Sequence, residues 1–189
     1  MNALVLNGTR ADDAGIEPVF DVLIEELTKA GFEPEPVLAR ELDVAPCRGC
    51  FACWEQNPGE CLTDDDSRRI AAKLIATDLL ILFTPVAFGG YASPLKMLLD
   101  RMLPLISPFF TEVDGETHHV PRYEHYPPLM CVGVHPHPDE ETRSVFSTLA
   151  ERNAINMYSP HHWAGIVSPD DEKLASYLRQ MIRFTREDA

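Results

Sequence analysis

The chain has 189 residues, of which 45% are hydrophobic and 24% charged, and its formal net charge is −14. This length and composition predict a globular protein with a real core, most simply one domain over residues 1–189. The acidic charge argues against nucleic acid or an anionic membrane as a partner, because either would require a basic surface. No apolar run is long enough to span a bilayer, and the chain enters an apolar strand at once without a signal-peptide pattern, so the expected compartment is the cytoplasm.

Strand-like and helix-like stretches alternate along the chain, beginning with a buried strand over residues 2–7. An amphipathic helix is expected over 18–30, because Pro18 suits a first helical turn and Gly31 suits a C-terminal stop. A second strand over 34–39 contains two prolines and is therefore an edge candidate. The remaining elements are expected, in order, as a helix over 64–76, a strand over 78–84, a helix over 93–103, a strand over 129–135, a helix over 140–153, a strand over 156–167 and a helix over 170–185.

Residues 107–128 form a polar stretch with prolines, histidines and four aromatic side chains. A connection of this length in a compact domain is usually functional. We expect it to be an insertion that acts as a flap or as an interface. Its aromatic residues favour a dimer or larger homo-oligomer, because aromatic side chains are enriched in interface cores.

Five strands joined by helices indicate an α/β protein with a mostly parallel sheet and right-handed crossovers. Ligands of such sheets bind beyond the carboxyl ends of the strands. Loops 8–17, 85–93 and 135–139 are expected at that rim. The cysteine-bearing loop that follows the second strand is expected at the same rim.

Four cysteines, Cys47, Cys50, Cys53 and Cys61, lie in a single short run. Thiols at successive i, i+3 spacing can surround one face of a compact metal centre, and four thiolates are the ligand set of a 4Fe–4S cluster. The alternatives are a structural zinc site, a disulfide framework and an inherited run that holds no metal. Zinc usually takes two separated Cys-x-x-Cys hooks, so the spacing favours iron–sulfur over zinc. Cys131 lies inside an apolar strand and is expected in the core.

Four segments carry a resemblance to a known family: Asn7-Gly8-Thr9-Arg10, the cysteine run ending in Asp64-Asp65, Thr84-Pro85-Val86-Ala87-Phe88-Gly89-Gly90, and Ser93-Pro94-Leu95-Lys96 with Asp100-Arg101. Together they resemble the flavodoxin-like NAD(P)H-dependent FMN reductase family, and within it the iron–sulfur flavoproteins. The resemblance implies a three-layer sandwich with a five-stranded parallel sheet in the order 2-1-3-4-5, bound FMN, and a homodimer or homotetramer. In the iron–sulfur members the cysteine run holds a 4Fe–4S cluster close to the flavin.

The resemblance also implies which residues hold the flavin. Loop 8–17 leads into a helix N-terminus, where free N–H groups and the helix dipole can hold a phosphate. In this loop the hydroxyl of Thr9 and the guanidinium of Arg10 could donate hydrogen bonds to the phosphate. Loop 85–90 is apolar and contains two glycines, so its backbone can approach a flat ring. The residues expected to bind FMN are Thr9, Arg10, Gly15, Ile16, Thr84, Pro85, Val86, Ala87, Phe88, Gly89 and His135.

The first loop departs from the family pattern. Asp12, Asp13 and Glu17 stand where the family usually has small hydroxyl or amide residues. A carboxylate about 6 Å from a phosphate dianion costs roughly 1–6 kcal/mol, so these side chains would weaken FMN binding unless they point outward. Ala87 stands where the family often has Tyr, which removes an aromatic contact near the ring.

The expected function is that of an FMN-dependent NAD(P)H oxidoreductase. A nicotinamide would pass hydride to the flavin, and electrons would go on to a quinone, another flavin, a metal or another small-molecule acceptor. No catalytic acid or base is assigned, because hydride transfer to flavin needs none. One alternative is an iron–sulfur electron carrier that exchanges single electrons with a ferredoxin-like protein. The other is a non-enzymatic family member with weakened FMN binding.

Overall fold

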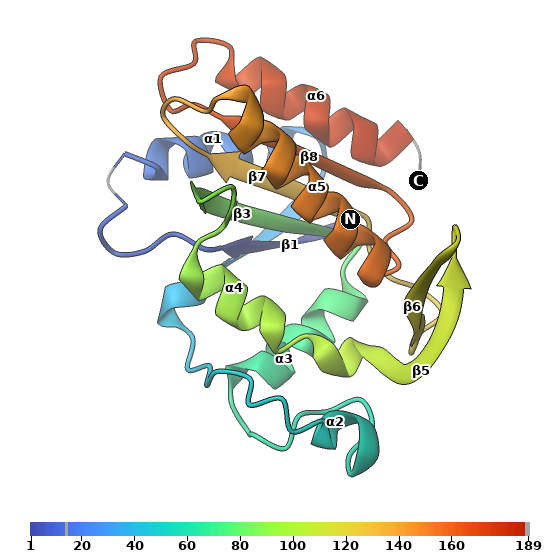
Figure 1. Cartoon of the computed structure of the whole chain (residues 1–189). Helices are drawn as coiled ribbons and strands as arrows, with labels where there is room; N and C mark the ends of the chain where they lie inside the picture. Colours follow the sequence, from blue (N-terminus) through green and yellow to red (C-terminus); the bar gives the residue numbers. More distant parts are fainter. Residues whose placement is uncertain (14, 188–189) are drawn as a thin grey trace.

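The computed structural model describes residues 1–13 and 15–187 and centres on a parallel β-sheet (Figure 1). The strand order is β2-β1-β3-β7-β8, and every pair along this path is parallel. These are the expected strands in the expected order 2-1-3-4-5, so the flavodoxin-like fold is confirmed. The strands are β1 Asn2–Asn7, β2 Glu33–Leu38, β3 Leu79–Ala87, β7 Leu129–Val134 and β8 His162–Val167.

The sheet is apolar on both faces, because alternate residues of its strands pack against different layers of helices. In β1, Leu4 and Leu6 join one core, whereas Ala3 and Val5 join the other. In β3, at the middle of the sheet, residues 79–85 are all buried. A strand that is covered on both faces is a continuous apolar run, which explains why these segments were recognisable in the sequence.

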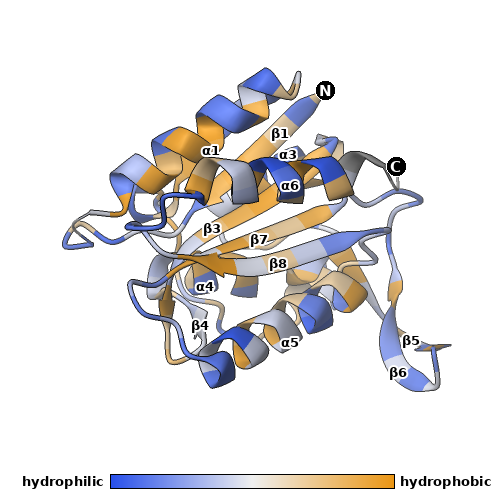
Figure 2. Cartoon of the chain, turned by 90° about the horizontal axis from the view of Figure 1, so that it is seen from above, coloured by the Kyte–Doolittle hydropathy of each residue, from blue (hydrophilic) through white to orange (hydrophobic). Residues whose placement is uncertain are grey.

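Two layers of helices cover the sheet and complete the expected three-layer sandwich (Figures 1 and 2). One core is formed with α1 and α6, and the other with α3, α4 and α5. Figure 2 shows the apolar colouring concentrated on the strands between these layers. The helices are α1 Glu17–Lys29, α2 Ala52–Glu55, α3 Asp66–Ala76, α4 Ser93–Asp100, α5 Glu140–Asn156 and α6 Leu174–Glu187, with the 3-10 turns η1 Ala39–Glu41 and η2 Leu103–Leu105.

The segment 107–128 is largely an antiparallel hairpin, in which β5 Ile106–Val113 pairs with β6 Glu116–Pro121. Asp114 and Gly115 join the strands with φ angles of 51° and 82°. Positive φ at both positions is what a two-residue Asp-Gly hairpin turn requires. The sequence analysis expected an insertion here but no strands, because prolines and histidines interrupt the alternation of apolar and polar residues.

The structure corrects the boundaries of the last elements. The strand expected over 156–167 begins only at His162, while α5 continues to Asn156. The chain turns over residues 157–161, where Tyr158 has a φ of 51° and Pro160 has no N–H to donate to a sheet. The last helix begins at residue 174 rather than at 170. Within residues 1–13 and 15–187, no helix is long and apolar enough to cross a membrane.

Candidate functional site

Three loops that follow the carboxyl ends of β1, β3 and β7 lie at one rim of the sheet (Figure 1). Gly8, directly after β1, donates its N–H to the carbonyl of Phe83 in β3 at 2.7 Å. A Cβ at Gly8 would lie 2.5 Å from the Cβ of Leu95 in α4, so this close approach requires glycine. His135, after β7, donates its N–H to the carbonyl of Val167 at 3.0 Å. The strand ends thus bring the loops together, as the topology predicts.

Thr9 is held in the first loop by two neighbouring side chains. Its N–H donates to Asn7 Oδ1 at 2.9 Å, and its buried hydroxyl accepts from Arg40 Nη1 at 2.6 Å. Arg40 comes from η1, directly after β2, and β2 lies beside β1 in the sheet. Arg40 was not among the residues expected to bind FMN, although a basic residue just after the strand next to β1 is a signal that could have identified it. A guanidinium that the sequence analysis did not assign therefore reaches the loop that was expected to hold a phosphate.

Arg10 binds an anion that belongs to its own chain, the carboxylate of Asp13. The backbone N–H of Arg10 donates to Asp13 Oδ2 and its Nη2 donates to Asp13 Oδ1, each at 2.7 Å. The Asp13 side chain is only 7% exposed. Burial raises the pKa of the Asp13 carboxyl, but the hydrogen bonds from Arg10 and the charges of Arg10 and Arg40 outweigh burial, so the pKa lies below its usual value. Asp13 is therefore ionised at neutral pH.

The end of the first loop forms the N-terminus of α1. Gly15 has a φ of 83°, and Ile16 is the N-cap residue of α1 with no side-chain hydrogen bond to cap the helix. Free N–H groups and the helix dipole at such a position favour an anion. Thr9, Arg10, Gly15 and Ile16 thus share one loop, and its donors fit a phosphate once Asp13 is displaced from them.

The second loop is shaped from inside by Thr84. Its side chain is fully buried, and its hydroxyl donates to the Pro85 carbonyl and accepts from the Ala92 N–H, both at 2.9 Å. The chain then turns back through β4 Gly90–Tyr91, which pairs antiparallel with the end of β3. Thr84 therefore fixes the path of the loop from beneath its surface.

Phe88 projects from the tip of the second loop and is fully exposed. Its φ of 51° is unfavourable for a bulky residue, and such backbone strain clusters at binding and active sites. Gly89 is buried against α5, where a Cβ would lie 2.6 Å from Val145 Cγ1. Val86 and Ala87 are half-buried. An exposed aromatic ring on a loop that is itself fixed is a candidate contact for a flat ligand.

His135 borders the rim on the β7 side. Its side chain is half-buried, and its Nδ1 accepts the N–H of His137 at 3.2 Å. The residues expected to bind FMN therefore fall into three neighbouring loops. Thr84 and Pro85 are buried at the end of β3, and Thr9 and Gly89 are also buried, whereas the remaining residues of this set are half-buried or exposed.

The cysteines are all unpaired thiols, but their exposures differ. Cys47 and Cys50 are exposed, Cys61 is half-buried, and Cys53 and Cys131 are buried. Burial raises the pKa of Cys53, and the charges of Cys61, Cys47 and Cys50 act in the same direction. They fit a 4Fe–4S cluster in the number and type of donor. As the loop is folded, no three His, Cys, Asp or Glu side chains of the described residues form a metal-binding group, so the ligand assignment stays a prediction.

The base of the cysteine loop is tied to α3 and α4. Asp65, the N-cap residue of α3, accepts from the N–H of Ala45 at 3.1 Å and from Arg101 Nη2 at 2.9 Å. Arg68 Nε donates to the carbonyl of Cys61 at 2.7 Å. These bonds fix both ends of the loop, although Cys47 and Cys50 between them remain at the surface.

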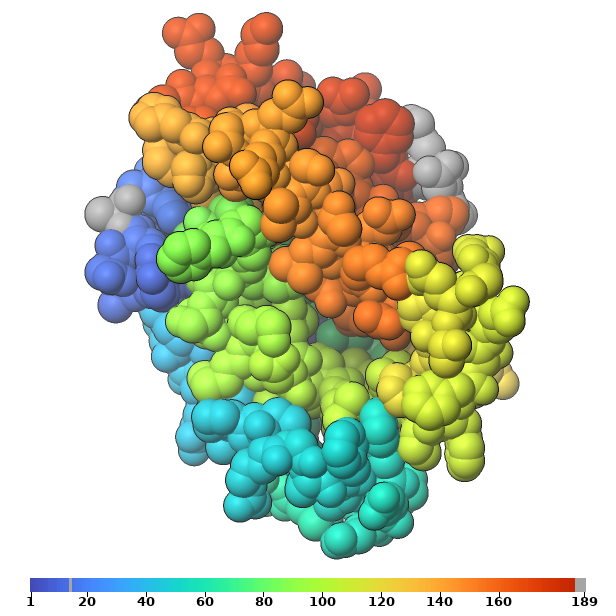
Figure 3. Space-filling model, viewed as in Figure 1, coloured from blue at the N-terminus to red at the C-terminus, as the bar shows by residue number. Residues whose placement is uncertain are grey.

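The centre of the cysteine loop lies away from the rim, which shows that the expected position was wrong. Trp54 in α2 donates its indole N–H to the carbonyls of Leu103 at 3.2 Å and Ile106 at 3.0 Å, beyond the C-terminal end of α4. Because α4 starts near the rim and runs away from it, α2 lies toward the far end of the molecule (Figures 1 and 3). The cause is a pair of contacts between distant segments, because the indole N–H of Trp54 and the carboxylate of Asp65 both bond to residues at that end of α4.

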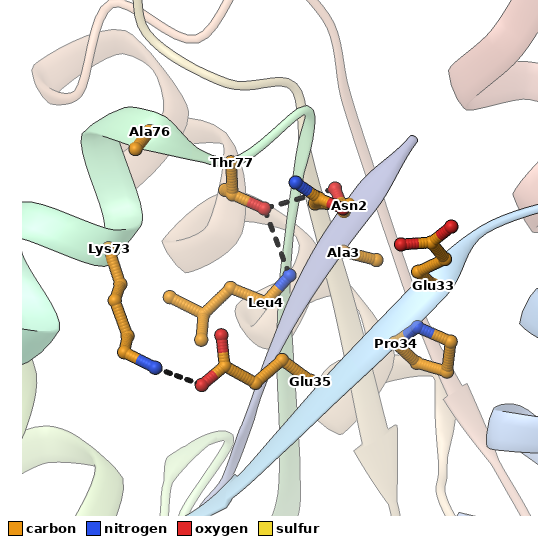
Figure 4. Close-up of a pocket in the computed structure, with 9 residues that line it drawn as sticks. All are labelled: Asn2, Ala3, Leu4, Glu33, Pro34, Glu35, Lys73, Ala76 and Thr77. Carbon is orange, nitrogen blue, oxygen red and sulfur yellow. Dashed lines mark hydrogen bonds and ion pairs between the residues drawn. The ribbon is translucent and has the colours of Figure 1, made fainter.

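A hollow of about 420 Å³ lies at the other end of the strands from the rim, beside the amino ends of β1 and β2 (Figure 4). Lys73 of α3 pairs there with Glu35 of β2. The Thr77 hydroxyl donates to the carbonyl of Asn2 at 3.0 Å and accepts from the N–H of Leu4 at 3.1 Å. These polar groups are partnered within the protein, and the hollow is separate from the rim that carries the flavin loops.

Known proteins resemble about half of the chain in sequence. A family model described as NADPH-dependent FMN reductase matches residues 1–110. An iron–sulfur flavoprotein of Methanosarcina thermophila is 34% identical over 100 residues, which make up 53% of this chain and 51% of that protein. The chain spans about half the length of the curated relatives it matches.

Solved structures resemble the whole fold. An NAD(P)H:quinone oxidoreductase from Methanothermobacter marburgensis gives a TM-score of 0.66 at 14% identity, covering 100% of this chain and 97% of that one. RosB, solved with bound 8-demethyl-8-formylriboflavin-5'-phosphate, gives 0.66 at 18% identity, covering 100% and 78%. At these identities the likeness shows the fold alone. The family model, by contrast, covers more than half of the chain and both the first and second loops, and the chain therefore belongs to the NADPH-dependent FMN reductase family.

Proposed function

We propose that the protein is an FMN-dependent NAD(P)H oxidoreductase. The observation that carries this proposal is the first loop, in which Arg40 bonds to Thr9, Arg10 holds an anionic side chain, and the chain then enters α1 at an N-terminus without a side-chain cap. This cradle lies beside a fixed apolar loop at the carboxyl ends of the strands, where ligands of such folds bind. Membership of the FMN reductase family supports a flavin as the ligand.

Each loop has a separate task in this proposal. Thr9, Arg10, Gly15 and Ile16 would hold the phosphate through a hydroxyl, a guanidinium and backbone N–H groups. The segment from Pro85 to Gly89 and the side chain of His135 would border the ring, with Phe88 as an aromatic cover. Bound FMN would supply hydride acceptance from NADH or NADPH and electron delivery to a quinone, flavin, metal or other small acceptor.

A titration of apo protein with FMN, followed by quenching of flavin fluorescence, tests the proposal. We expect saturable binding and reduction of bound flavin by NAD(P)H without oxygen. Arg40→Met should weaken FMN binding roughly tenfold, because it removes a charge-assisted hydrogen bond from the cradle. The matched control is Arg69→Met, which removes an exposed arginine of α3 that lies outside the first loop. Absence of binding at micromolar FMN would contradict the proposal and favour a non-enzymatic family member.

A second candidate function is that of an iron–sulfur electron carrier with a ferredoxin-like partner. The observation that favours it is that Cys47, Cys50, Cys53 and Cys61 are unpaired thiols of one loop, in the number and type that a 4Fe–4S cluster requires. Iron, sulfide and zinc would be measured in protein purified without oxygen and in single Cys→Ser variants. Loss of iron and sulfide in the four loop variants, but not in the buried Cys131→Ser control, is the expected result. Equal metal content in all of them would eliminate the cluster.

The domain organisation and the oligomeric state of the protein are also part of this proposal. We infer one flavodoxin-like domain over residues 1–189 with the segment 107–128 as an insertion, since the hairpin β5–β6 pairs only with itself among the described strands. A homodimer or homotetramer in the cytoplasm, without nucleic-acid or membrane partners, agrees with the acidic charge and the exposed aromatic residues of the hairpin.

A further inference from the structure

Asp13 occupies the place in the first loop where the donors for a bound anion converge. One carboxylate oxygen accepts a hydrogen bond from the backbone N–H of Arg10 and the other accepts one from its guanidinium, each at a donor–acceptor distance of 2.7 Å. The Asp13 side chain is 7% exposed. The charge of Arg40, which bonds to the Thr9 hydroxyl at 2.6 Å, also acts on this carboxylate. The Arg10 donors that would hold a phosphate are thus already occupied by an anion of the protein itself.

Asp12 has the same charge and lies next to Asp13, but its position is different. Its side chain is 82% exposed and approaches Arg10 Nε at 3.8 Å, so solvent screens it. Asp12 can remain where it is when a ligand enters, whereas Asp13 cannot, because an incoming phosphate needs the same N–H groups of Arg10. The two aspartates therefore form a matched pair in which only one competes with the ligand.

We propose that Asp13 is a specificity-determining residue that competes with the flavin phosphate as an internal anion. This inference rests on the proposed function and adds a prediction about which flavin the site prefers. FMN must displace Asp13 from Arg10 and then tolerate a carboxylate near its dianionic phosphate. Riboflavin, which has the same ring but no phosphate, meets neither cost. The protein should accordingly gain little affinity from the phosphate and bind FMN and riboflavin with similar dissociation constants.

The decisive experiment measures both flavins against wild type, Asp13→Asn, Asp13→Ser and the control Asp12→Asn. Asparagine keeps an oxygen that accepts the Arg10 N–H but removes the charge, so the shape of the loop is retained. We expect Asp13→Asn to tighten FMN at least tenfold and to change riboflavin less than twofold. Asp12→Asn should change both flavins less than threefold. Millimolar inorganic phosphate should compete with FMN in Asp13→Asn more strongly than in wild type.

The outcomes separate this inference from the proposed function. Flavin binding with an unchanged ratio of FMN to riboflavin affinity in both Asp13 variants would overturn the inference and leave the proposed function standing. A parallel loss of FMN and riboflavin affinity in both Asp13 variants would show that Asp13 is a structural brace, which also overturns it. No binding of either flavin to any of the four proteins would overturn the proposed function and the inference together.

Discussion

Arg101 is a buried charge whose ion pair supports the cysteine loop. Arg101 and Asp65 have side chains that are 3% and 5% exposed, and Arg101 Nη2 lies 2.9 Å from Asp65 Oδ2. Asp65 in turn accepts the N–H of Ala45 at the start of the loop. Because both charges are nearly free of solvent, each depends on the other for compensation. The pair therefore links the stability of the fold to the order of the loop.

Removal of Arg101 should be strongly destabilising. Arg101→Met leaves the carboxylate of Asp65 buried and lowers the free energy of unfolding by about 3–5 kcal/mol, as for other broken buried pairs. Urea denaturation followed by circular dichroism measures the change. The matched control is Lys96→Met in the exposed Lys96–Asp100 pair of α4, where a loss below about 1 kcal/mol is expected. Equal effects of the two substitutions would show that the burial of the Arg101 pair has no energetic consequence.

The thiols should differ sharply in reactivity. Cys47 and Cys50 are exposed, whereas Cys131 is buried, and burial raises its pKa to about 12. Because the thiolate is the reactive species, iodoacetamide at pH 8 should modify Cys47 and Cys50 within minutes in metal-free protein and leave Cys131 untouched until unfolding. Mass spectrometry of tryptic peptides, with urea-unfolded protein as the control, measures both. Labelling of native Cys131 as fast as Cys47 would refute this assignment.

At the scale of elements, α1 and α6 are joined by a buried carboxylate. Glu26 of α1 is 2% exposed and accepts from Arg179 Nε of α6 at 2.7 Å. This hydrogen bond from Arg179 lowers the pKa of Glu26 to about 2, with a further contribution from Lys29 and against the opposing effect of burial. The native state therefore favours the ionised form more than the unfolded state does. This contribution to stability is complete above about pH 4.5 and is lost as the pH falls towards 2.

Glu26→Gln should remove this pH dependence. The variant is expected to be less stable than wild type at pH 6, by about 1–3 kcal/mol after allowance for the half-exposed Arg179. The difference should shrink steadily between pH 4.5 and pH 2.5, as measured by urea midpoints. Glu25→Gln is the control, because Glu25 also pairs with Lys29 but is 62% exposed. A constant difference at all pH values would indicate that packing, and not charge, is responsible.

The elements that could be predicted are those whose residues pack locally in a regular pattern. The strand β3 is apolar throughout because both its faces are covered, and Asp65 caps α3 where the acidic triplet was expected to begin a helix. The hairpin β5–β6 was missed because its strands lack a buried face, although Asp114-Gly115 signalled its turn. The end of α5 was misplaced because a left-handed Tyr158, rather than a glycine, stops it.

In the candidate site, too, some features could be predicted from the sequence and others could not. Loop positions follow from strand order, so the sequence predicted that Thr9, Arg10 and the second loop lie at the carboxyl ends of the strands. Arg40 and the buried position of Asp13 were not predicted, because both depend on contacts between segments. The cysteine loop was assigned to the rim because it follows β2, but the contacts of Trp54 beyond α4 place its centre elsewhere. Sequence order predicts where a long loop begins, whereas its distant partners decide where it lies.

At the scale of the whole molecule, an aromatic surface joins the cysteine loop to the hairpin. The rings of Phe51 and Trp54 are 5.2 Å apart, and His119 lies 4.7 Å from both Trp54 and Phe110. Phe109 and Phe110 are 71% and 67% exposed. Exposed aromatic rings that gather in one patch are typical of a surface that a second chain covers.

We therefore expect a homo-oligomer that depends on this surface. Light scattering should give at least twice the monomer mass for wild type, and the double substitution Phe109→Ser, Phe110→Ser should reduce the mass to that of a monomer, because it removes the apolar area on the hairpin. Phe184→Ser is the matched control, since Phe184 is 47% exposed on α6, in a different part of the molecule, and should leave the mass unchanged. A wild type that stays monomeric at high concentration would rule out the interface.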